Sequence, residues 1–179
     1  LGASCLAQVY GRIGDEGPDC DDAGQLRAFV GAAIELRRKG LILAYHDRSD
    51  GGLFAALAEM AFAGHCGLDI TMASGDHAGA VAELFAEELG AVLQVETLRL
   101  AEVQAVFAAA GLDSVVRDLG TAEAFDRIVI DDRHGQTVLD ATRTDLRSAW
   151  SETSYRLQRL RDNPVCAHEE REQATDPRN

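Results

Sequence analysis

The chain has 179 residues, of which 46% are hydrophobic and 26% are charged, a balance that is ordinary for a globular domain with a sizeable core. Its formal net charge of −13 argues against nucleic acid or an anionic membrane as the main partner, because both need a basic protein face. Nucleotides are compatible with this charge, since carboxylates can hold a Mg²⁺ ion whose coordination is completed by phosphate oxygens.

Several common site types and targeting signals are missing from the sequence. A glycine-rich phosphate loop ending in lysine does not occur, and Lys39 is the only lysine. The four cysteines form no C-x-x-C pair and no small disulfide framework, which favours a reduced, cytoplasmic chain. No apolar stretch is long enough to cross a membrane. Because the chain starts abruptly at Leu1 without a signal-peptide pattern, we expect it to be a piece of a longer polypeptide.

Hydrophobic periodicity predicts strands and helices that interleave along the chain. Residues 1–10 are predicted to be strand-like or partly buried, ahead of an acidic loop at 14–22. Helices are predicted at 22–39, 52–64, 81–89, 100–110 and 142–161, and strands at 41–45, 68–71, 91–95, 115–119, 127–131 and 137–140. A hairpin turn at His134-Gly135 spoils a purely parallel sheet, so the sequence predicts an α+β fold with a mixed sheet packed with helices.

The chain changes character after its last predicted helix. Thr142 and Asp145 form a capping-box pattern that opens this helix, and Asn163-Pro164 ends it. The residues that follow are polar and short of apolar side chains, so a loose tail is predicted. We therefore divide the chain into one domain at residues 1–162 and a linker or tail at 163–179.

The stretch with the clearest chemical potential is the turn HDRSDGG at residues 46–52, which connects a predicted strand to a predicted helix. Asp47 lies at the strand end, where a carboxylate is a suitable hard ligand for Mg²⁺. Ser49 offers a hydroxyl to a phosphate or to the water shell of the metal. Gly51 and Gly52 permit close backbone approach, and the amides and dipole of a helix N-terminus favour anions. The pattern predicts a phosphate and Mg²⁺ site.

The same turn also has a purely structural interpretation. Ser49 or Asp50 can cap the following helix and Asp47 can make a turn hydrogen bond, because such caps are common. A histidine at a strand end, such as His46, is more typical of a structural position than of an acid–base group. The histidine and cysteine spacings fit no zinc finger or ribbon, and the absence of G-x-S-x-G argues against a Ser–His–Asp hydrolase.

Two charged groups lie outside this turn. Glu87 and Glu88 fall near the end of a predicted helix and are most simply interpreted as a solvated helix end. Acidic side chains oppose the helix dipole there, and this small misfit is a hint, and no more, of another role for one of them. Arg156, Arg159 and Arg161 lie on the last predicted helix. We interpret these arginines as a solvated or inter-domain face rather than as a phosphate site.

Several motifs in order resemble one enzyme family. The segments YHDRSDGGL, EMAFAGHCGLD, EELGAVLQV and RLQRLRDNPVCA closely resemble successive segments of the large, single-chain phosphoribosylformylglycinamidine synthases. LGASCLAQVYGRIGD resembles the stretch just upstream, so that the similarity covers residues 1–167. It implies the second C-terminal domain of the aminoimidazole-ribonucleotide (AIR) synthase type, with residues 161–179 leading toward a glutaminase domain.

The resemblance implies a ligase that uses ATP and glutamine to convert formylglycinamide ribonucleotide to formylglycinamidine ribonucleotide in de novo purine biosynthesis. It implies that Asp47 binds Mg²⁺ and that Ser49 contacts a nucleotide, described in these enzymes as an auxiliary, structural ADP. The catalytic groups of the family lie on segments missing from this chain. The resemblance therefore implies no catalytic residue here, an inactive isolated piece, and partners in the remaining synthetase and glutaminase domains.

Two other interpretations stay open. The domain could be a non-catalytic folding and interaction module, whose acidic surface and last helix dock against neighbouring domains. It could also belong to another ATP-dependent enzyme of the same superfamily, such as a selenophosphate synthetase or a thiamine-phosphate kinase. The segments RLQRLRDNP and EMAFAGHCG argue against this last interpretation.

Overall fold

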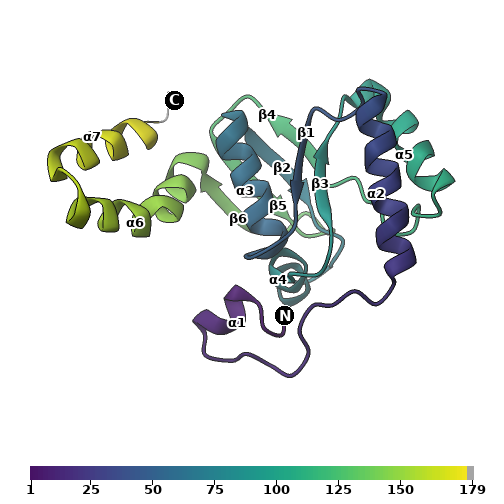
Figure 1. Cartoon of the computed structure of the whole chain (residues 1–179), viewed down its shortest axis with the longest axis horizontal. Helices are drawn as coiled ribbons and strands as arrows, with labels where there is room; N and C mark the ends of the chain where they lie inside the picture. Colours follow the sequence, from purple (N-terminus) through teal and green to yellow (C-terminus); the bar gives the residue numbers. More distant parts are fainter. Residues whose placement is uncertain (177–179) are drawn as a thin grey trace. The chain divides into compact units, whose positions relative to one another are not determined.

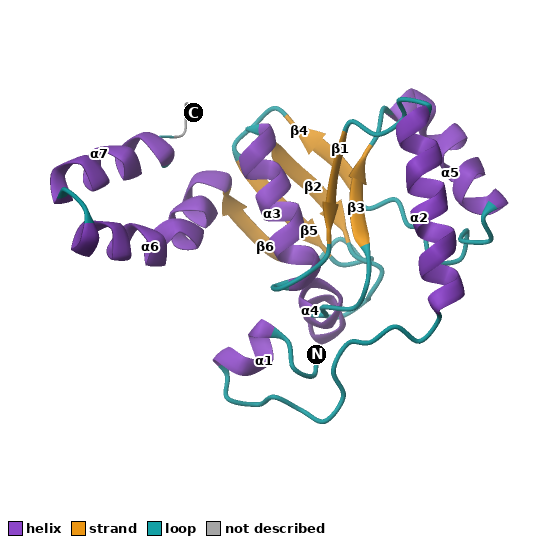
Figure 2. Cartoon of the chain, viewed as in Figure 1, coloured by secondary structure: helices purple, strands orange, loops and turns teal. Residues whose placement is uncertain are grey.

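The computed structural model describes residues 1–176, which form two compact units. The first consists of Leu1–Met60 and Val81–Asp118, and the second of Ala61–Ala80 together with the chain from Leu119 onward (Figures 1 and 2). Helices occur beside a sheet with both parallel and antiparallel pairs, which confirms the predicted α+β fold with a mixed sheet. Among the described residues, no helix has both the length and the apolar character needed to span a membrane.

The first unit contains a two-stranded antiparallel sheet and the helices around it. Strand β1 pairs with β3, and Asp47 at the end of β1 lies opposite Ala91. The elements are α1 (Cys5–Val9), α2 (Ala23–Arg38), β1 (Ala44–Asp47), β3 (Ala91–Gln94), the 3-10 helix η1 (Thr97–Arg99) and α5 (Leu100–Ala109). Helix α3 (Gly52–Gly64) begins in this unit, and α4 (His77–Phe85) ends in it.

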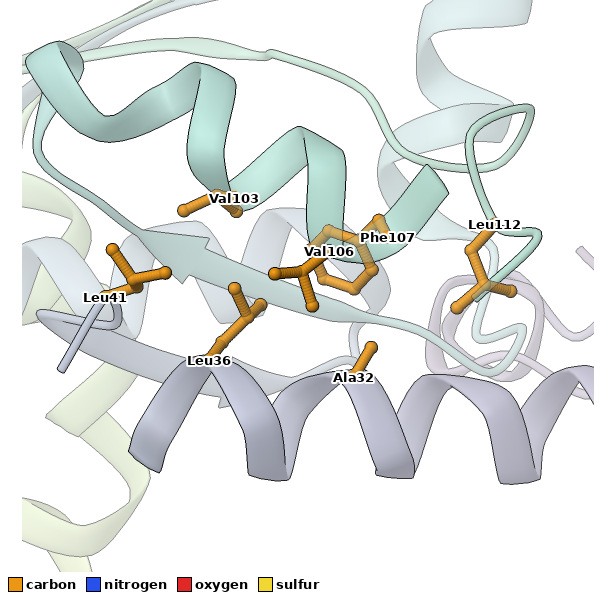
Figure 3. Close-up of a cluster of buried hydrophobic side chains, with 7 residues drawn as sticks. All are labelled: Ala32, Leu36, Leu41, Val103, Val106, Phe107 and Leu112. Carbon is orange, nitrogen blue, oxygen red and sulfur yellow. The ribbon is translucent and has the colours of Figure 1, made fainter. Parts of the chain in front are cut away.

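A buried apolar cluster holds α2 and α5 together (Figure 3). Ala32 and Leu36 are four residues apart and therefore share one face of α2, which meets the buried face of α5. Leu93 of β3 packs against the same cluster. The buried members are Ala32, Leu36, Leu41, Val103, Val106, Phe107 and Leu112. Burial of each larger side chain contributes about 1.5–3 kcal/mol, so this core fixes β3 and, through strand pairing, the end of β1.

The second unit is built on a four-stranded mixed sheet with the strand order β4-β2-β5-β6. Strands β2 and β5 are parallel, and the other two pairs are antiparallel. Ile128 and Ile130 are both buried, because alternate residues of a strand share one face. The elements are β2 (Gly67–Thr71), β4 (Gly120–Glu123), β5 (Arg127–Asp131), β6 (Thr137–Thr142), α6 (Arg143–Arg161) and α7 (Pro164–Ala174).

Several predicted elements differ from the structure, among them the strand predicted at 41–45, which is observed as β1 at Ala44–Asp47. The N-terminal segment is helical rather than strand-like, because the Ser4 side chain caps α1 by accepting a hydrogen bond from the amide of Ala7 at 3.2 Å. Helix α4 begins earlier than predicted, after Asp76, whose carboxylate accepts from the amide of Gly79 at 2.8 Å. The strand predicted at 115–119 is absent, and β4 follows it instead; Val115 is in a turn and donates to the Leu112 carbonyl.

The prediction of a loose tail is wrong for Pro164–Ala174, which forms α7 and packs against α6. The helix starts efficiently, since Asn163 accepts from the amide of Val165 at 2.9 Å and proline occupies the first turn. Arg171 then links the two helices, with its guanidinium 2.6 Å from Glu152 and 4.5 Å from the ring centroid of Tyr155. Polar contacts therefore hold α7 against α6, whereas the prediction searched for apolar periodicity.

Candidate functional site: the turn between β1 and α3

The HDRSDGG turn is a short, tightly hydrogen-bonded connection. The amide of Arg48 donates to the Gly90 carbonyl at 2.8 Å and so continues the pairing of β1 with β3 by one residue. The amide of Gly52 donates to the Ser49 carbonyl at 2.9 Å. Gly51 and Gly52 have φ angles of +82° and +68°, a left-handed conformation that glycine adopts without steric cost. The backbone therefore reverses between strand and helix within a few residues.

Glycine is required at position 52 because backbone carbonyl groups of the same chain approach it closely. A Cβ atom at this position would lie 2.6 Å from the carbonyl oxygen of Leu84 and 2.9 Å from that of Ala86. The close approach that the structure shows at Gly52 is by the C-terminal end of α4 and the residue that follows it. This contact joins the turn to residues 84–86.

Asp47 and Ser49 present exposed side chains at the end of β1 and in the turn. Across residues 1–176, neither the Asp47 carboxylate nor the Ser49 hydroxyl makes a side-chain hydrogen bond or ion pair, and the same is true of Asp50. The structural interpretation, in which these side chains cap α3 or close the turn, is therefore not realised within this part of the chain. Their oxygen atoms are available to a ligand.

The capping function is performed by Glu87, a residue 36 positions away in the sequence. Its Oε1 atom accepts a hydrogen bond from the amide of Gly51 at 2.8 Å and another from the amide of Cys5, also at 2.8 Å. The carboxylate thus holds the head of α3 and the first turn of α1 together. Because α4 ends at Phe85, Glu87 lies outside that helix, and the expected conflict with its dipole does not arise.

The electrostatics of Glu87 follow from these bonds. Partial burial by itself would raise the pKa of the carboxyl group, but the hydrogen bonds from the amides of Cys5 and Gly51 stabilise the charged form and bring the pKa below its ordinary value of 4.5. The only sequence signal for this role was the unfavourable position of an acid near a predicted helix end. That signal could not identify the partners.

Arg48 and His46 support the turn through other contacts. The guanidinium of Arg48 donates from Nη2 to the Leu89 carbonyl at 3.1 Å and from Nε to the Glu88 carbonyl, which fixes the segment before β3. His46 places Nδ1 2.6 Å from the Asp47 carbonyl and Nε2 2.8 Å from the Glu59 carboxylate of α3. The contact with the Asp47 carbonyl raises the pKa of His46; burial opposes this effect and Glu59 adds to it.

A second group of possible metal ligands lies beside the turn. One ligand atom from each of Cys5, Asp50 and Glu87 lies within 4.8 Å of the others. Glu87 already accepts two backbone hydrogen bonds with one of its oxygens. Within the described residues no histidine joins such a group.

The arginines of the last predicted helix have ordinary surface partners. Arg156 pairs with Glu152 at 2.6 Å, one helical turn away, and Arg161 pairs with Asp162 at 2.8 Å. Arg159 lies 5.6 Å from the ring centroid of Tyr155. Exposed pairs of this kind contribute little to stability. The interpretation of these arginines as a solvated or inter-domain face stays a prediction.

The fold is of the α+β class and carries a strand–turn–helix element in which the Asp47 carboxylate and the Ser49 hydroxyl are exposed. Residues 1–133 match the family described as AIR synthase related protein, C-terminal domain. The chain belongs to this family. The matched region includes the whole HDRSDGG turn and Glu87.

Solved structures from Thermotoga maritima have a similar fold. Phosphoribosylformylglycinamidine synthase II gives a TM-score of 0.58 at 15% identity, covering 68% of this chain and 21% of that chain. PurLQS gives 0.60 at 13% identity, covering 79% and 24%, and PurL complexed with ATP gives 0.58 at 15% identity, covering 73% and 23%. The chain thus spans about a fifth to a quarter of these relatives and shares its fold with a part of them.

Proposed function

We propose that this chain is the second AIR-synthase-type C-terminal domain of a large phosphoribosylformylglycinamidine synthase, a cytoplasmic ligase. The parent enzyme would use ATP and glutamine to form formylglycinamidine ribonucleotide. In this proposal residues 1–162 are the domain, and residues 163–179 connect it to a glutaminase domain. The family match and the fold shared with the Thermotoga maritima proteins support the assignment, and a further structure with this fold is Thermotoga maritima PurL complexed with FGAR.

Within that enzyme, the domain would contribute Asp47 and Ser49 to an Mg²⁺–nucleotide site. The observation that carries this proposal is the contrast within the turn: the backbone is tied down by Glu87 and Arg48, while the two predicted ligand side chains are exposed and uncommitted across residues 1–176. A fixed carboxylate suits Mg²⁺, which typically binds one or two carboxylates together with phosphate oxygens and water. The Ser49 hydroxyl would contact the nucleotide.

Asp47 and Ser49 are suitable contacts for a Mg²⁺–nucleotide, but they do not form a complete binding site by themselves. Asp47 supplies one carboxylate, so further metal ligands must come from other domains of the parent enzyme. Bound Mg²⁺ would neutralise phosphate charge. We propose an ADP that stabilises the assembly, and we expect the isolated chain to show no conversion of the formylglycinamide substrate with ATP and ammonia.

Asp47→Asn should weaken retention of the Mg²⁺–nucleotide by about tenfold or more in the parent polypeptide, because a neutral amide is a poor replacement for a charged metal ligand. The measurement is the amount of ADP that remains bound through purification, together with the melting temperature. Asp19→Asn is the matched control, since Asp19 is also exposed but lies outside the turn and outside the group of possible metal ligands formed by Cys5, Asp50 and Glu87.

The control variant should retain nucleotide as the unmodified enzyme does. Unchanged nucleotide content and melting temperature in Asp47→Asn would contradict the metal role and favour the alternative of a folding and interaction module. The assignment of the parent enzyme is tested by the full open reading frame that encodes this chain. If that frame lacked an upstream synthetase region and a downstream glutaminase, the assignment would be wrong.

A further inference from the structure

The N-terminal segment, residues 1–17, is folded largely on itself. The amide of Ala3 donates to the Ile13 carbonyl at 2.6 Å, which closes a loop within the segment. Helix α1 buries none of its residues, and residues 8–27 are all exposed. A long loop connects α1 to α2 (Figure 1). A segment with so little buried surface is of the kind that opens locally at a low free-energy cost.

The segment is held to the rest of the chain at one place. Among the first 176 residues, the hydrogen bonds that connect residues 1–17 to other parts of the chain end at Glu87 and Gly51. The amide of Cys5 donates to Oε1 of Glu87 at 2.8 Å. Burial, and the Glu87 carboxylate with it, raises the pKa of the Cys5 thiol, so the thiol is protonated at neutral pH and donates to the same carboxylate.

The same oxygen atom of Glu87 also supports the HDRSDGG turn. It accepts a hydrogen bond at 2.8 Å from the amide of Gly51, two residues after Ser49. Because one oxygen atom accepts from both amides, displacement of Cys5 alters the support of Gly51. A single side chain therefore connects α1 to the turn that carries the proposed ligand contacts.

We propose that docking of α1 on Glu87 and ordering of the HDRSDGG turn are coupled, so that α1 is a conformational device that controls the ligand affinity of the turn. Docked α1 gives Glu87 its second backbone donor and so holds the carboxylate at Gly51. A ligand bound at Asp47 and Ser49 stabilises docked α1 in return, because a coupling free energy acts equally in both directions. The ligand affinity in this inference rests on the proposed function, whereas the coupling of α1 to the turn does not.

Cys5→Pro removes the connecting donor with little cost to α1. Proline has no backbone N–H, so the hydrogen bond to Glu87 is lost. Cys5 is the first residue of α1, a position that favours proline, and Ser4 before it has φ −63° and ψ 157°, an extended conformation that a following proline favours. Cys5→Ala is the matched control, because it removes the thiol and keeps the amide. Circular dichroism should show that both variants are folded.

The first test measures amide hydrogen exchange of the turn, residues 46–52, in the full chain. We expect exchange there to be about fivefold faster or more in Cys5→Pro than in Cys5→Ala, since the change at α1 reaches the turn through Glu87. A purely local role of Cys5 would leave the exchange of this distant segment unchanged.

The same experiment on Glu87 variants checks the connection from its centre. Glu87→Ala should speed exchange in α1 and in the turn together, and Glu87→Gln should restore part of the protection because its amide oxygen can still accept. Equal exchange of the turn in Cys5→Pro and Cys5→Ala, or faster exchange in Glu87→Ala on one side only, would overturn the inference.

The second test measures the release of ADP from the parent polypeptide. We expect Cys5→Pro to release ADP about fivefold faster than Cys5→Ala. Equal release from these two variants, together with loss of nucleotide in Asp47→Asn, would show that α1 does not control ligand affinity. Absence of nucleotide from the unmodified enzyme would contradict the proposed function and, with it, the control of ligand affinity, while the exchange experiment would still decide whether α1 and the turn are coupled.

Discussion

Gly52→Ala is expected to lower the free energy of unfolding by about 3 kcal/mol, as measured by urea denaturation. Placing a side chain at a left-handed residue costs about 1–2 kcal/mol, and the φ angle of Gly52 is +68°. The added Cβ atom would also meet the Leu84 carbonyl oxygen at 2.6 Å, which forces the backbone of the turn or of residues 84–86 to move. Both effects destabilise the HDRSDGG turn, which contains Asp47 and Ser49.

Gly111→Ala separates these two contributions. Gly111 has a similar φ angle of +75°, but a Cβ atom there would have no other atom within 4 Å. This variant should therefore lose only the conformational part, about 1 kcal/mol. An equal loss in the two variants would show that the turn does not touch Leu84 and Ala86 as described.

The elements that the sequence predicted correctly are those with local signals. Asp22 caps α2 by accepting from the amides of Gly24 and Gln25, and Gly40 beyond its end has a φ angle of +65°. Thr142 caps α6 by accepting from the amide of Asp145 at 3.0 Å. In each case the residues that decide the structure lie within four positions of one another, so a single sequence contains the relevant interaction.

The order of strands in the sheet could not be predicted in this way. Strand β2 lies between β4 and β5, and its parallel register with β5 pairs Leu68 with Ile128. This pairing depends on packing between segments that are distant along the chain. Helix α7 was missed for a related reason, since its contacts with α6 are polar and are invisible to a search for apolar periodicity.

In the candidate site, too, the local features were predicted and the contacts between distant residues were not. The turn, its glycines and the exposed Asp47 and Ser49 were found from residue types at close spacing, and their ligand roles stay predictions. The support of the turn was not found, because the amides of Gly51 and Cys5 meet the Glu87 carboxylate from positions 36 and 82 residues away. Residue type alone could not distinguish Glu87 from its neighbour Glu88.

Glu87→Ala is expected to lower the free energy of unfolding by about 2 kcal/mol, because the amides of Gly51 and Cys5 lose a charged acceptor that a side chain of alanine cannot replace. The loss is moderated because the carboxylate is only partly buried and water can reach the freed amides. Glu87→Gln should lose less, since its amide oxygen can still accept. Glu88→Ala is the control: Arg48 uses the backbone carbonyl of Glu88, which the substitution retains, so stability should change by less than about 0.5 kcal/mol.

The pH dependence distinguishes a charged acceptor at Glu87 from a neutral one. The hydrogen bonds place the pKa of Glu87 in the folded protein below its ordinary value of 4.5, so its carboxylate stabilises the fold fully above that pH. The stabilisation is lost as the pH falls through the lower, folded-state pKa. Glutamine does not titrate, so the difference in unfolding free energy between the unmodified chain and Glu87→Gln should shrink below about pH 4.5. A difference that stays constant across this range would show that the turn is held by hydrogen-bond geometry alone and not by the charge of Glu87.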